Sequence, residues 1–310
     1  MKPKNTNTIQ SDLSEDAHGK KNEEMFYQPI KDRYIDPFTD FGFKKLFGEE
    51  CNKDLLLDFL NELLRKEEGR IVSISYLPGE RAGYVKESRK AVFDIFCENE
   101  KGEKFIVELQ KAKQDFFKDR TLFYTTFPIT EQAIHGEWDF ELKAVYTIAI
   151  LNFVFDEDKN DPEKYRYDVM LTDIETHKIF YDKLTFIYLE MPKFNKSIDE
   201  LKTRFDKWMY VIKNLNRLEE IPDALRERIF EKLLTAAEVA KLTIDEARAY
   251  FKSINAARDL KNCLDTAKME GEAKERKQIV LKSHHAGLPE ETIAIITGLT
   301  ILEIREIIKN

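Results

Sequence analysis

Cysteine is scarce in this chain, with three residues among 310, at Cys51, Cys97 and Cys263. No two of them have the close spacing of a zinc or redox motif, so neither a disulfide framework nor a cysteine-ligated metal is expected. Long apolar runs are also absent. The sequence contains no run of about 18 apolar residues, which is the length needed to cross a membrane, and its polar N-terminus has no signal-peptide core. These absences predict a reduced, cytoplasmic protein without a membrane partner.

An excess of positive charge is missing as well. Lysine and arginine total 50 and the acids 58, which gives a net charge of −8 and a pI near 5.4. A surface that binds nucleic acid would therefore have to be a local basic patch, because phosphate contacts need lysine and arginine. The apolar share of 42% and the charged share of 35% are typical of a soluble globular protein. Its length allows one large core with an appendage, or two domains.

The segment from Ala91 to Lys113 predicts a β-hairpin. Its flanks are rich in Phe, Ile, Val and Leu, which favour strands, and Asn99-Glu100-Lys101-Gly102-Glu103 between them is turn material. Gly102 supplies the left-handed residue that a three-residue loop needs. Asn99 then lies opposite Glu103, and the register of the remaining pairs follows from this loop.

In that register Asp94 lies opposite Glu108, and Val92 lies opposite Gln110. Side chains alternate along strands. One face should therefore carry Val92, Asp94, Phe96, Ile106, Glu108 and Gln110. The other should be apolar core, made of Phe93, Ile95, Cys97, Phe105, Val107 and Leu109.

Two opposed carboxylates on a strand pair destabilise it, and apolar neighbours make the repulsion worse by removing water. A hard divalent cation removes the conflict, since Mg²⁺ takes one or two carboxylates and completes its shell with water and phosphate oxygens. The alternative is that both acids lie on a solvated edge, with Lys104 and Lys111 as neighbours. The hairpin by itself leaves both interpretations open.

An acid on one strand followed by Glu-x-Lys or Glu-x-Gln on the next resembles the signature of PD-(D/E)xK nucleases. More narrowly, the chain resembles the Rpn family of recombination-promoting nucleases, often described as putative transposases. Three segments carry this resemblance in the family's order. They are the opening motif Asp36–Gly48, the hairpin with Asp94, Glu108 and Gln110, and the strand end Tyr188–Phe194.

The resemblance covers about residues 33 to 234 and implies an α/β fold. Its restriction-endonuclease-like core, a mixed β-sheet flanked by helices, would occupy residues 33–232. A disordered polar tail is expected over residues 1–32, and a helical C-terminal region over residues 233–310. Patterns of apolar residues predict further strands over 71–76, 144–155, 165–173 and 178–189.

The activity that the resemblance implies is metal-dependent DNA endonuclease chemistry, which hydrolyses phosphodiester bonds and promotes recombination or acts in defence against foreign DNA. Asp94 and Glu108, with the carbonyl of Leu109, would hold Mg²⁺, or alternatively Mn²⁺. Gln110 takes the place of the superfamily lysine. It can orient a water but carries no charge. Asp40 matches an acidic residue that the family places near the metal, although Thr39 or Asp40 is also a plausible helix N-cap.

Five basic residues are candidate DNA contacts near these acids: Lys44, Lys45, Arg89, Lys90 and Arg120. Solvated surface positions are the alternative for each of them. Arg120 is four residues from Tyr124 on a helix predicted over residues 111–126, which would end before Pro128.

The C-terminal region is helical in pattern, with one long helix expected within residues 233–269. Residues 288–304 look like a helix-turn-helix whose second helix begins near Thr300. That helix is poor in groups that read bases, which favours a protein contact or dimerisation over DNA reading. A homodimer would suit double-strand cutting.

Two other classes of function stay open. One is a catalytically inactive nuclease fold that binds DNA or a protein partner. The other is an interaction protein whose C-terminal helices do the main work.

Overall fold

The computed structural model describes residues 32–64, 70–81, 91–133 and 139–309. The expected disordered tail lies almost entirely outside these residues, as do Arg89 and Lys90. The chain divides into two compact units, the first ending at Tyr250 and the second covering Phe251–Asn310. The first unit therefore extends past residue 232.

A six-stranded sheet forms the centre of the first unit, in the order β1-β4-β5-β6-β8-β7. Its strands are β1 (Ile74–Tyr76), β4 (Ile95–Asn99), β5 (Lys104–Gln110), β6 (Val145–Leu151), β7 (Arg166–Thr172) and β8 (Ile179–Glu190). The β5–β6 and β6–β8 pairs are parallel and the others antiparallel. This confirms the predicted mixed sheet. Two short strands, β2 (Glu80–Arg81) and β3 (Ala91–Val92), pair separately.

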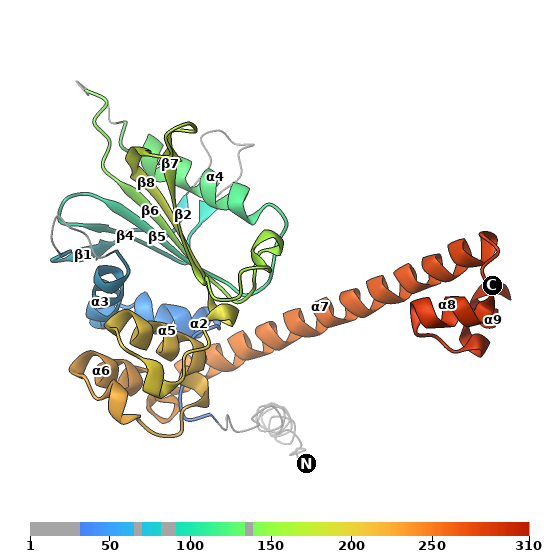
Figure 1. The fold of residues 1–310 in the computed structure, drawn as a ribbon. Coiled ribbons are helices and arrows are strands. Elements are labelled where there is room, and N and C mark those ends of the chain that lie inside the picture. The colour runs from blue at the N-terminus through green and yellow to red at the C-terminus, as the bar shows by residue number, and fades with distance from the viewer. Residues whose placement is uncertain (1–31, 65–69, 82–90, 134–138, 310) are drawn as a thin grey trace, which may run out of the picture. The chain divides into compact units, whose positions relative to one another are not determined.

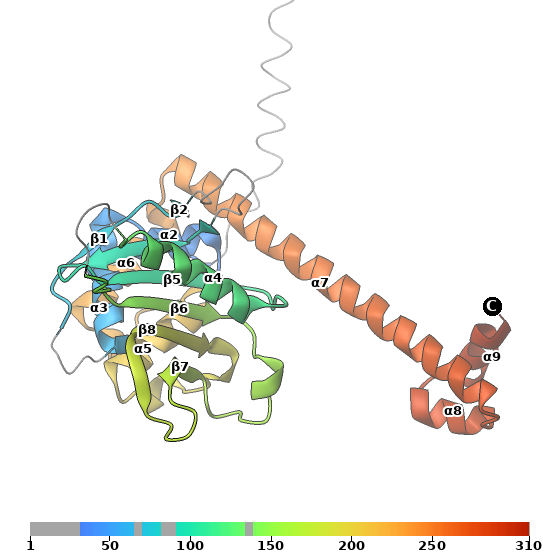
Figure 2. The same cartoon turned by 90° about the horizontal axis from the view of Figure 1, so that it is seen from above.

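Helices cover both faces of the sheet. One face carries α4 (Phe117–Thr130), and the other faces α2 (Asp40–Phe47), α3 (Lys53–Leu64) and α5 (Arg204–Asn214), with α6 (Arg228–Ala237) packed on α2 and α3 (Figures 1 and 2). Thr39 caps α2, because its hydroxyl accepts the Gly42 N–H at 2.9 Å.

The helix after the hairpin differs from its prediction at both ends. It begins at Phe117 rather than Lys111, and it runs through Pro128 to Thr130. Proline is disfavoured inside a helix because it lacks an N–H donor. Here Pro128 lies in the last turn, and both it and Phe127 are buried. Phe127 packs against the core on the α4 face, which favours continuation of the helix past the proline.

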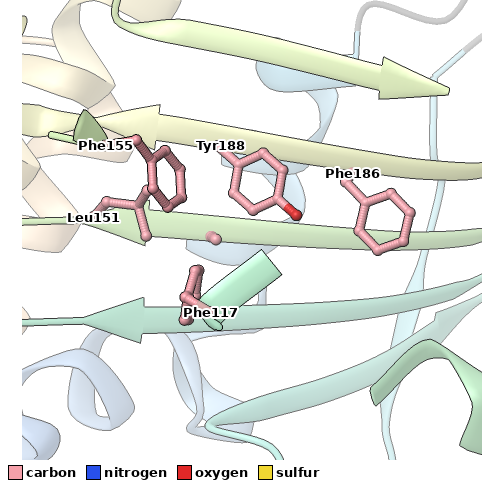
Figure 3. Packing of buried hydrophobic residues seen from close by; sticks show 6 residues of the cluster. Phe117, Leu151, Phe155, Phe186 and Tyr188 are labelled. Carbon is pink, nitrogen blue, oxygen red and sulfur yellow. The ribbon is translucent and has the colours of Figure 1, made fainter. Parts of the chain in front are cut away.

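On the α4 face, aromatic side chains fill the space between α4 and strands β6 and β8. This cluster consists of Phe117, Ala149, Leu151, Phe155, Phe186 and Tyr188 (Figure 3). The Tyr188 hydroxyl is bonded to the Thr121 hydroxyl at 2.8 Å, so its polar end is satisfied within the apolar cluster.

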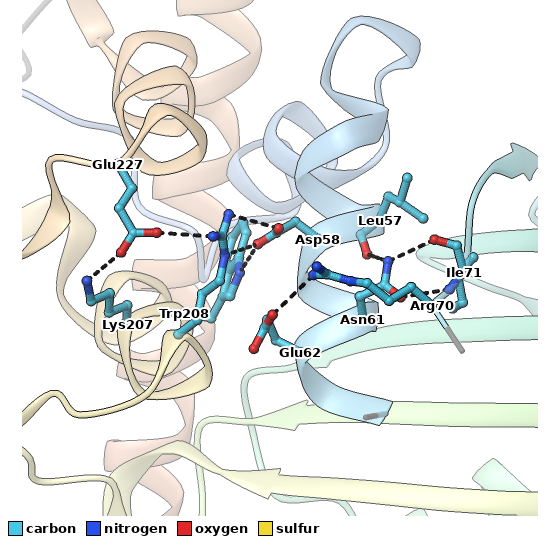
Figure 4. A network of polar contacts seen from close by, with 10 residues as sticks. Leu57, Asp58, Asn61, Glu62, Arg70, Ile71, Lys207, Trp208 and Glu227 are labelled. Carbon is cyan, nitrogen blue, oxygen red and sulfur yellow. Dashed lines mark hydrogen bonds and ion pairs between the residues drawn. The ribbon is translucent and has the colours of Figure 1, made fainter. Parts of the chain in front are cut away.

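On the opposite face, Trp208 joins the helices. Its ring contacts those of Phe47, Phe59 and Phe230, and its indole N–H donates to Asp58 at 2.8 Å. Arg204 binds the same carboxylate and also Glu227, which pairs with Lys207 (Figure 4). Polar groups next to this core are therefore neutralised within the chain.

The end of β8 is closed by a buried ion pair. Glu190 is 0% exposed, accepts the Phe155 N–H at 2.7 Å and pairs with Lys193 at 2.8 Å. Lys193 also donates to the carbonyl of Asp158 and to the Tyr167 hydroxyl. Burial alone would lower the pKa of Lys193, yet its bonds to Glu190 and Tyr167 raise it overall.

The single long helix expected within residues 233–269 is replaced by two. Helix α6 ends at Ala237 and α7 (Ile244–His285) begins after a short turn. The second unit contains most of α7 with α8 (Glu290–Thr297) and α9 (Ile301–Lys309), joined by a core of Val280, Ile293 and Ile304. Gly298 has φ +69° between α8 and α9, as the predicted turn requires. None of the described helices is long and apolar enough to span a membrane.

Candidate active site

The hairpin has the predicted loop and register from Asn99 to Ile95. Gly102 adopts φ +79°, and the Asn99 N–H donates to the Glu103 carbonyl at 3.1 Å. The ladder then runs from the Glu98–Lys104 pair to the Ile95–Val107 pair. The next opposed positions are Asp94 and Glu108.

At Asp94 and Glu108 the strand ladder gives way to side-chain bonds. The Asp94 backbone N–H donates to Glu108 Oε1 at 3.2 Å, and the Leu109 N–H donates to Asp94 Oδ2 at 2.8 Å. Each carboxylate thus binds the backbone of the other strand. Because carboxylates take these two donors in place of carbonyls, β4 begins only at Ile95, and each acid is held in place by the backbone of the opposite strand.

Beyond Asp94 the predicted register is wrong. Val92 pairs with Glu80 in β2 instead of lying opposite Gln110, and it is exposed. Phe93 contacts Phe96 and Tyr124, so it packs on the α4 face rather than the face predicted for it. The chain turns away from β5 at the acids, since their side-chain bonds have already ended the ladder.

The two acids lie in a poorly hydrated place. Glu108 is 4% exposed and Asp94 is half-buried. Burial, and then the charge of Asp94, raise the pKa of Glu108 above its usual range. Burial likewise raises the pKa of Asp94, against the opposing effects of the Leu109 N–H and of Lys44. The solvated-edge interpretation is therefore excluded for Glu108.

Gln110 also lies on the α4 face and is buried. Its amide nitrogen donates to the Ala112 carbonyl at 2.8 Å, which orients its oxygen. That oxygen accepts from Nη2 of Arg120 at 2.7 Å. Arg120 of α4 is thus brought to the acid pair, where its charge acts to lower the pKa of both Asp94 and Glu108.

Two residues of α2 lie near enough to act on the acid pair electrostatically. Asp40 raises the pKa of Asp94, and Lys44 lowers that of both acids. Asp40 and Lys44 form an exposed ion pair at 2.7 Å. Lys45 instead forms ion pairs with Glu49 and Glu246, and the pair with Glu246 links α2 to the start of α7.

The sequence predicted no role in the site for two partly buried ionisable groups beside it, Asp36 and Lys111. Burial raises the pKa of Asp36 and lowers that of Lys111. The charges of Asp36, Asp40 and Asp94 partly oppose the shift of Lys111. Their places in the sequence could have identified both as site residues, because Lys111 directly follows Gln110 and Asp36 opens the motif that precedes α2.

The acid pair fits a hard divalent cation. Asp94 Oδ1 and Glu108 Oε2 accept no hydrogen bond from a described residue, so each acid keeps one oxygen available. In the part of the chain that the structure describes, no group of three or more His, Cys, Asp or Glu side chains is arranged for a metal ion. Mg²⁺ does not require one, since it binds through one or two carboxylates and retains waters.

A mixed sheet with helices on both faces and an acid pair on a central hairpin defines an α/β protein of the PD-(D/E)XK class. A family model described as PD-(D/E)XK nuclease family transposase matches residues 37–267. The chain belongs to this family, as its resemblance to nucleases of this kind predicted. Searches of curated proteins and of solved structures found no significant match.

Proposed function

We propose that this protein is a metal-dependent DNA endonuclease that hydrolyses phosphodiester bonds. The observation that supports this proposal most directly is the acid pair, in which Asp94 and Glu108 are held together without a described cation paired to either. Membership of a nuclease family supports nuclease chemistry in general. The geometry adds the residues that would carry it out.

Asp94 and Glu108, with the carbonyl oxygen of Leu109, are the groups that would hold Mg²⁺, and Mn²⁺ suits the same oxygen ligands. When bound, such an ion polarises a phosphate and lowers the pKa of a water. The backbone bonds to both carboxylates fix them before any substrate arrives, which reduces the reorganisation that catalysis requires. Asp40 remains a candidate for a supporting acid, because it interacts with Asp94 from α2.

DNA is the proposed partner, met by a local basic surface rather than by the acidic protein as a whole. Lys44 suits this role better than Lys45, because Lys44 is half-exposed whereas Lys45 is largely covered and bound to two carboxylates. Recombination and defence against foreign DNA are both consistent with such cleavage, in a cytoplasmic protein that acts as a monomer or homodimer.

The test is cleavage of supercoiled plasmid by purified protein in Mg²⁺, Mn²⁺ or EDTA. Glu108→Gln keeps an oxygen for the Asp94 N–H but removes the charge, so cleavage should fall by about 10³-fold, equivalent to several kcal/mol of barrier. Glu98→Gln is the matched control, because Glu98 is on the same hairpin and binds Lys104 instead.

Nicking or linearisation that needs both metal and Glu108 supports the proposal. If folded wild-type protein does not cut under any of these conditions, the endonuclease proposal fails. DNA binding without cleavage would then favour the alternative, an inactive nuclease fold that binds DNA.

A further inference from the structure

The acid pair has no lysine on β5 at the position of Gln110, and a positively charged side chain beside the metal site would further stabilise the charge that develops on a phosphate during cleavage. Gln110 is neutral, and its oxygen is already bound to Arg120 at 2.7 Å. The positive charge bonded to Gln110 therefore comes from α4, which follows β5 in the chain.

Arg120 is held in place without being neutralised. Its Nη2 donates to Gln110 and its Nη1 to Gln114 at 2.5 Å, and both acceptors are uncharged amide oxygens. The rings of Phe117 and Tyr124 lie 4.8 and 5.6 Å from the guanidinium carbon. Among the described residues, no carboxylate lies within ion-pair distance of Arg120, whereas neighbouring Lys118 pairs with Glu157 and Lys113 with Asp156.

The guanidinium also retains donors for a ligand. Arginine carries five N–H groups, and the described contacts use two of them. The buried Nε has no hydrogen-bond acceptor among the described residues. One N–H on each of Nη1 and Nη2 remains, which matches the bidentate way in which arginine binds phosphate oxygens.

We propose that Arg120 binds the scissile phosphate and supplies the positive charge at the acid pair, and that Gln110 positions it there. This inference rests on the proposed endonuclease function and assigns a role that the acids cannot fill. Arg120 is then a catalytic residue, and Gln110 a positioning residue that acts through it.

Lys111 is the competing cation. It follows Gln110 in the chain and interacts with Asp94. However, it also interacts electrostatically with Asp36 and Asp40, so its charge is shared among three acids. Arg120 cannot lose its proton under ordinary conditions and is bonded directly to Gln110, which makes it the better candidate.

The experiment measures single-turnover cleavage of a labelled DNA duplex in Mg²⁺, together with duplex affinity by anisotropy in EDTA. Arg120→Gln should slow cleavage at saturating protein by about 10²–10³-fold, the range for losing one transition-state donor. Affinity should change by less than about tenfold, because one phosphate contact contributes little to total binding. Arg120→Lys should restore part of the rate, since it returns the charge without the bidentate geometry.

Gln110→Met tests the positioning role while keeping the side-chain volume. It should slow cleavage by about tenfold in the wild-type background and have little further effect in Arg120→Gln, because coupled residues are not additive. Lys118→Gln is the control on α4 and should cleave at the wild-type rate. Thermal unfolding of each variant checks that it is folded. If Arg120→Gln is not folded, the cleavage rate of Arg120→Lys is compared with wild type instead.

The outcomes separate the two proposals. If wild type cleaves and Arg120→Gln cleaves within about threefold of it, or loses only affinity, the role of Arg120 is wrong while the endonuclease function stands. A loss with Lys111→Gln but not with Arg120→Gln also overturns it, in favour of Lys111. If wild type does not cleave, the endonuclease proposal falls and this inference falls with it.

Discussion

Two buried glutamates lie near the carboxyl ends of strands β5 and β8, at the same end of the sheet, and differ in what surrounds them. Glu190 ends β8 and Glu108 lies near the end of β5, and both strands run parallel to β6 between them. They are 0% and 4% exposed. Glu190 meets the ammonium of Lys193, whereas Glu108 meets the carboxylate of Asp94. The two glutamates are thus almost equally buried, but Glu190 has a positively charged neighbour and Glu108 a negatively charged one.

The two glutamates should therefore affect the stability of the fold differently, because only the buried charge of Glu190 is offset by an opposite charge. Burying a carboxylate costs free energy unless a partner of opposite charge and hydrogen bonds offset the loss of water. Lys193 provides that partner at β8. At β5 the chain offers two backbone N–H groups, one on each acid, and the more distant charges of Lys44 and Arg120. The acid pair is therefore the place where a cation from solution has most to stabilise.

The largest expected effect is a loss of stability when Glu190 loses its positively charged partner, Lys193. Lys193→Met leaves Glu190 buried without its cation, and the free energy of unfolding should fall by about 3–5 kcal/mol, as for other broken buried pairs. Denaturant titration measures it. Lys143→Met, which breaks an exposed pair with Glu141, is the control and should cost less than about 1 kcal/mol. Equal losses in the two variants would remove the contrast between the glutamates.

A smaller effect is expected from added Mg²⁺. At about 100 times its dissociation constant, an ion that binds only the folded state stabilises it by about 2.7 kcal/mol. Wild-type protein should show this gain as a rise in Tm, and Glu108→Gln should lose most of it. Glu98→Gln should respond as wild type does. The same Mg²⁺ response in all three proteins would show that the ion binds elsewhere.

The smallest effect concerns the acid pair without metal. In EDTA at pH 8, Glu108→Gln should stabilise the protein by about 1–2 kcal/mol, because it removes a buried charge while keeping an acceptor for Asp94 N–H. Folding raises the pKa of Glu108, so the folded wild type binds its proton more tightly than the unfolded chain does. The stability that Glu108 contributes through its raised pKa is therefore fully present below the unfolded pKa and is lost as pH rises through the folded pKa.

The gain from Glu108→Gln should accordingly be near zero at pH 4 and grow towards pH 8. Denaturant titrations at several pH values follow the difference between the two proteins. A constant difference across that range would contradict a raised pKa for Glu108, and a variant less stable than wild type at pH 8 would show that the acid pair is not strained.

Much of the site could be predicted from local sequence. The loop at Gly102 sets the hairpin register over a few residues, and period-two alternation then brings Asp94 to Glu108 and places Gln110 on the same face. The Thr39 cap and the strands of the sheet are likewise local patterns of polar and apolar residues. The family resemblance, carried by such segments, was confirmed over residues 37–267.

Other features were decided only by tertiary structure. Pairing with β2 draws Val92 away from β5, and packing against the core carries α4 through Pro128. The contact between Arg120 and Gln110 needs α4 folded back across the sheet. Lys193 is only three residues from Glu190, so their pairing is local, but the burial of the pair depends on the distant segment that supplies the Phe155 N–H and the Asp158 carbonyl. Local rules specify strands and turns because their hydrogen bonds span few residues, whereas the charge that reaches a buried acid depends on which distant segments pack beside it.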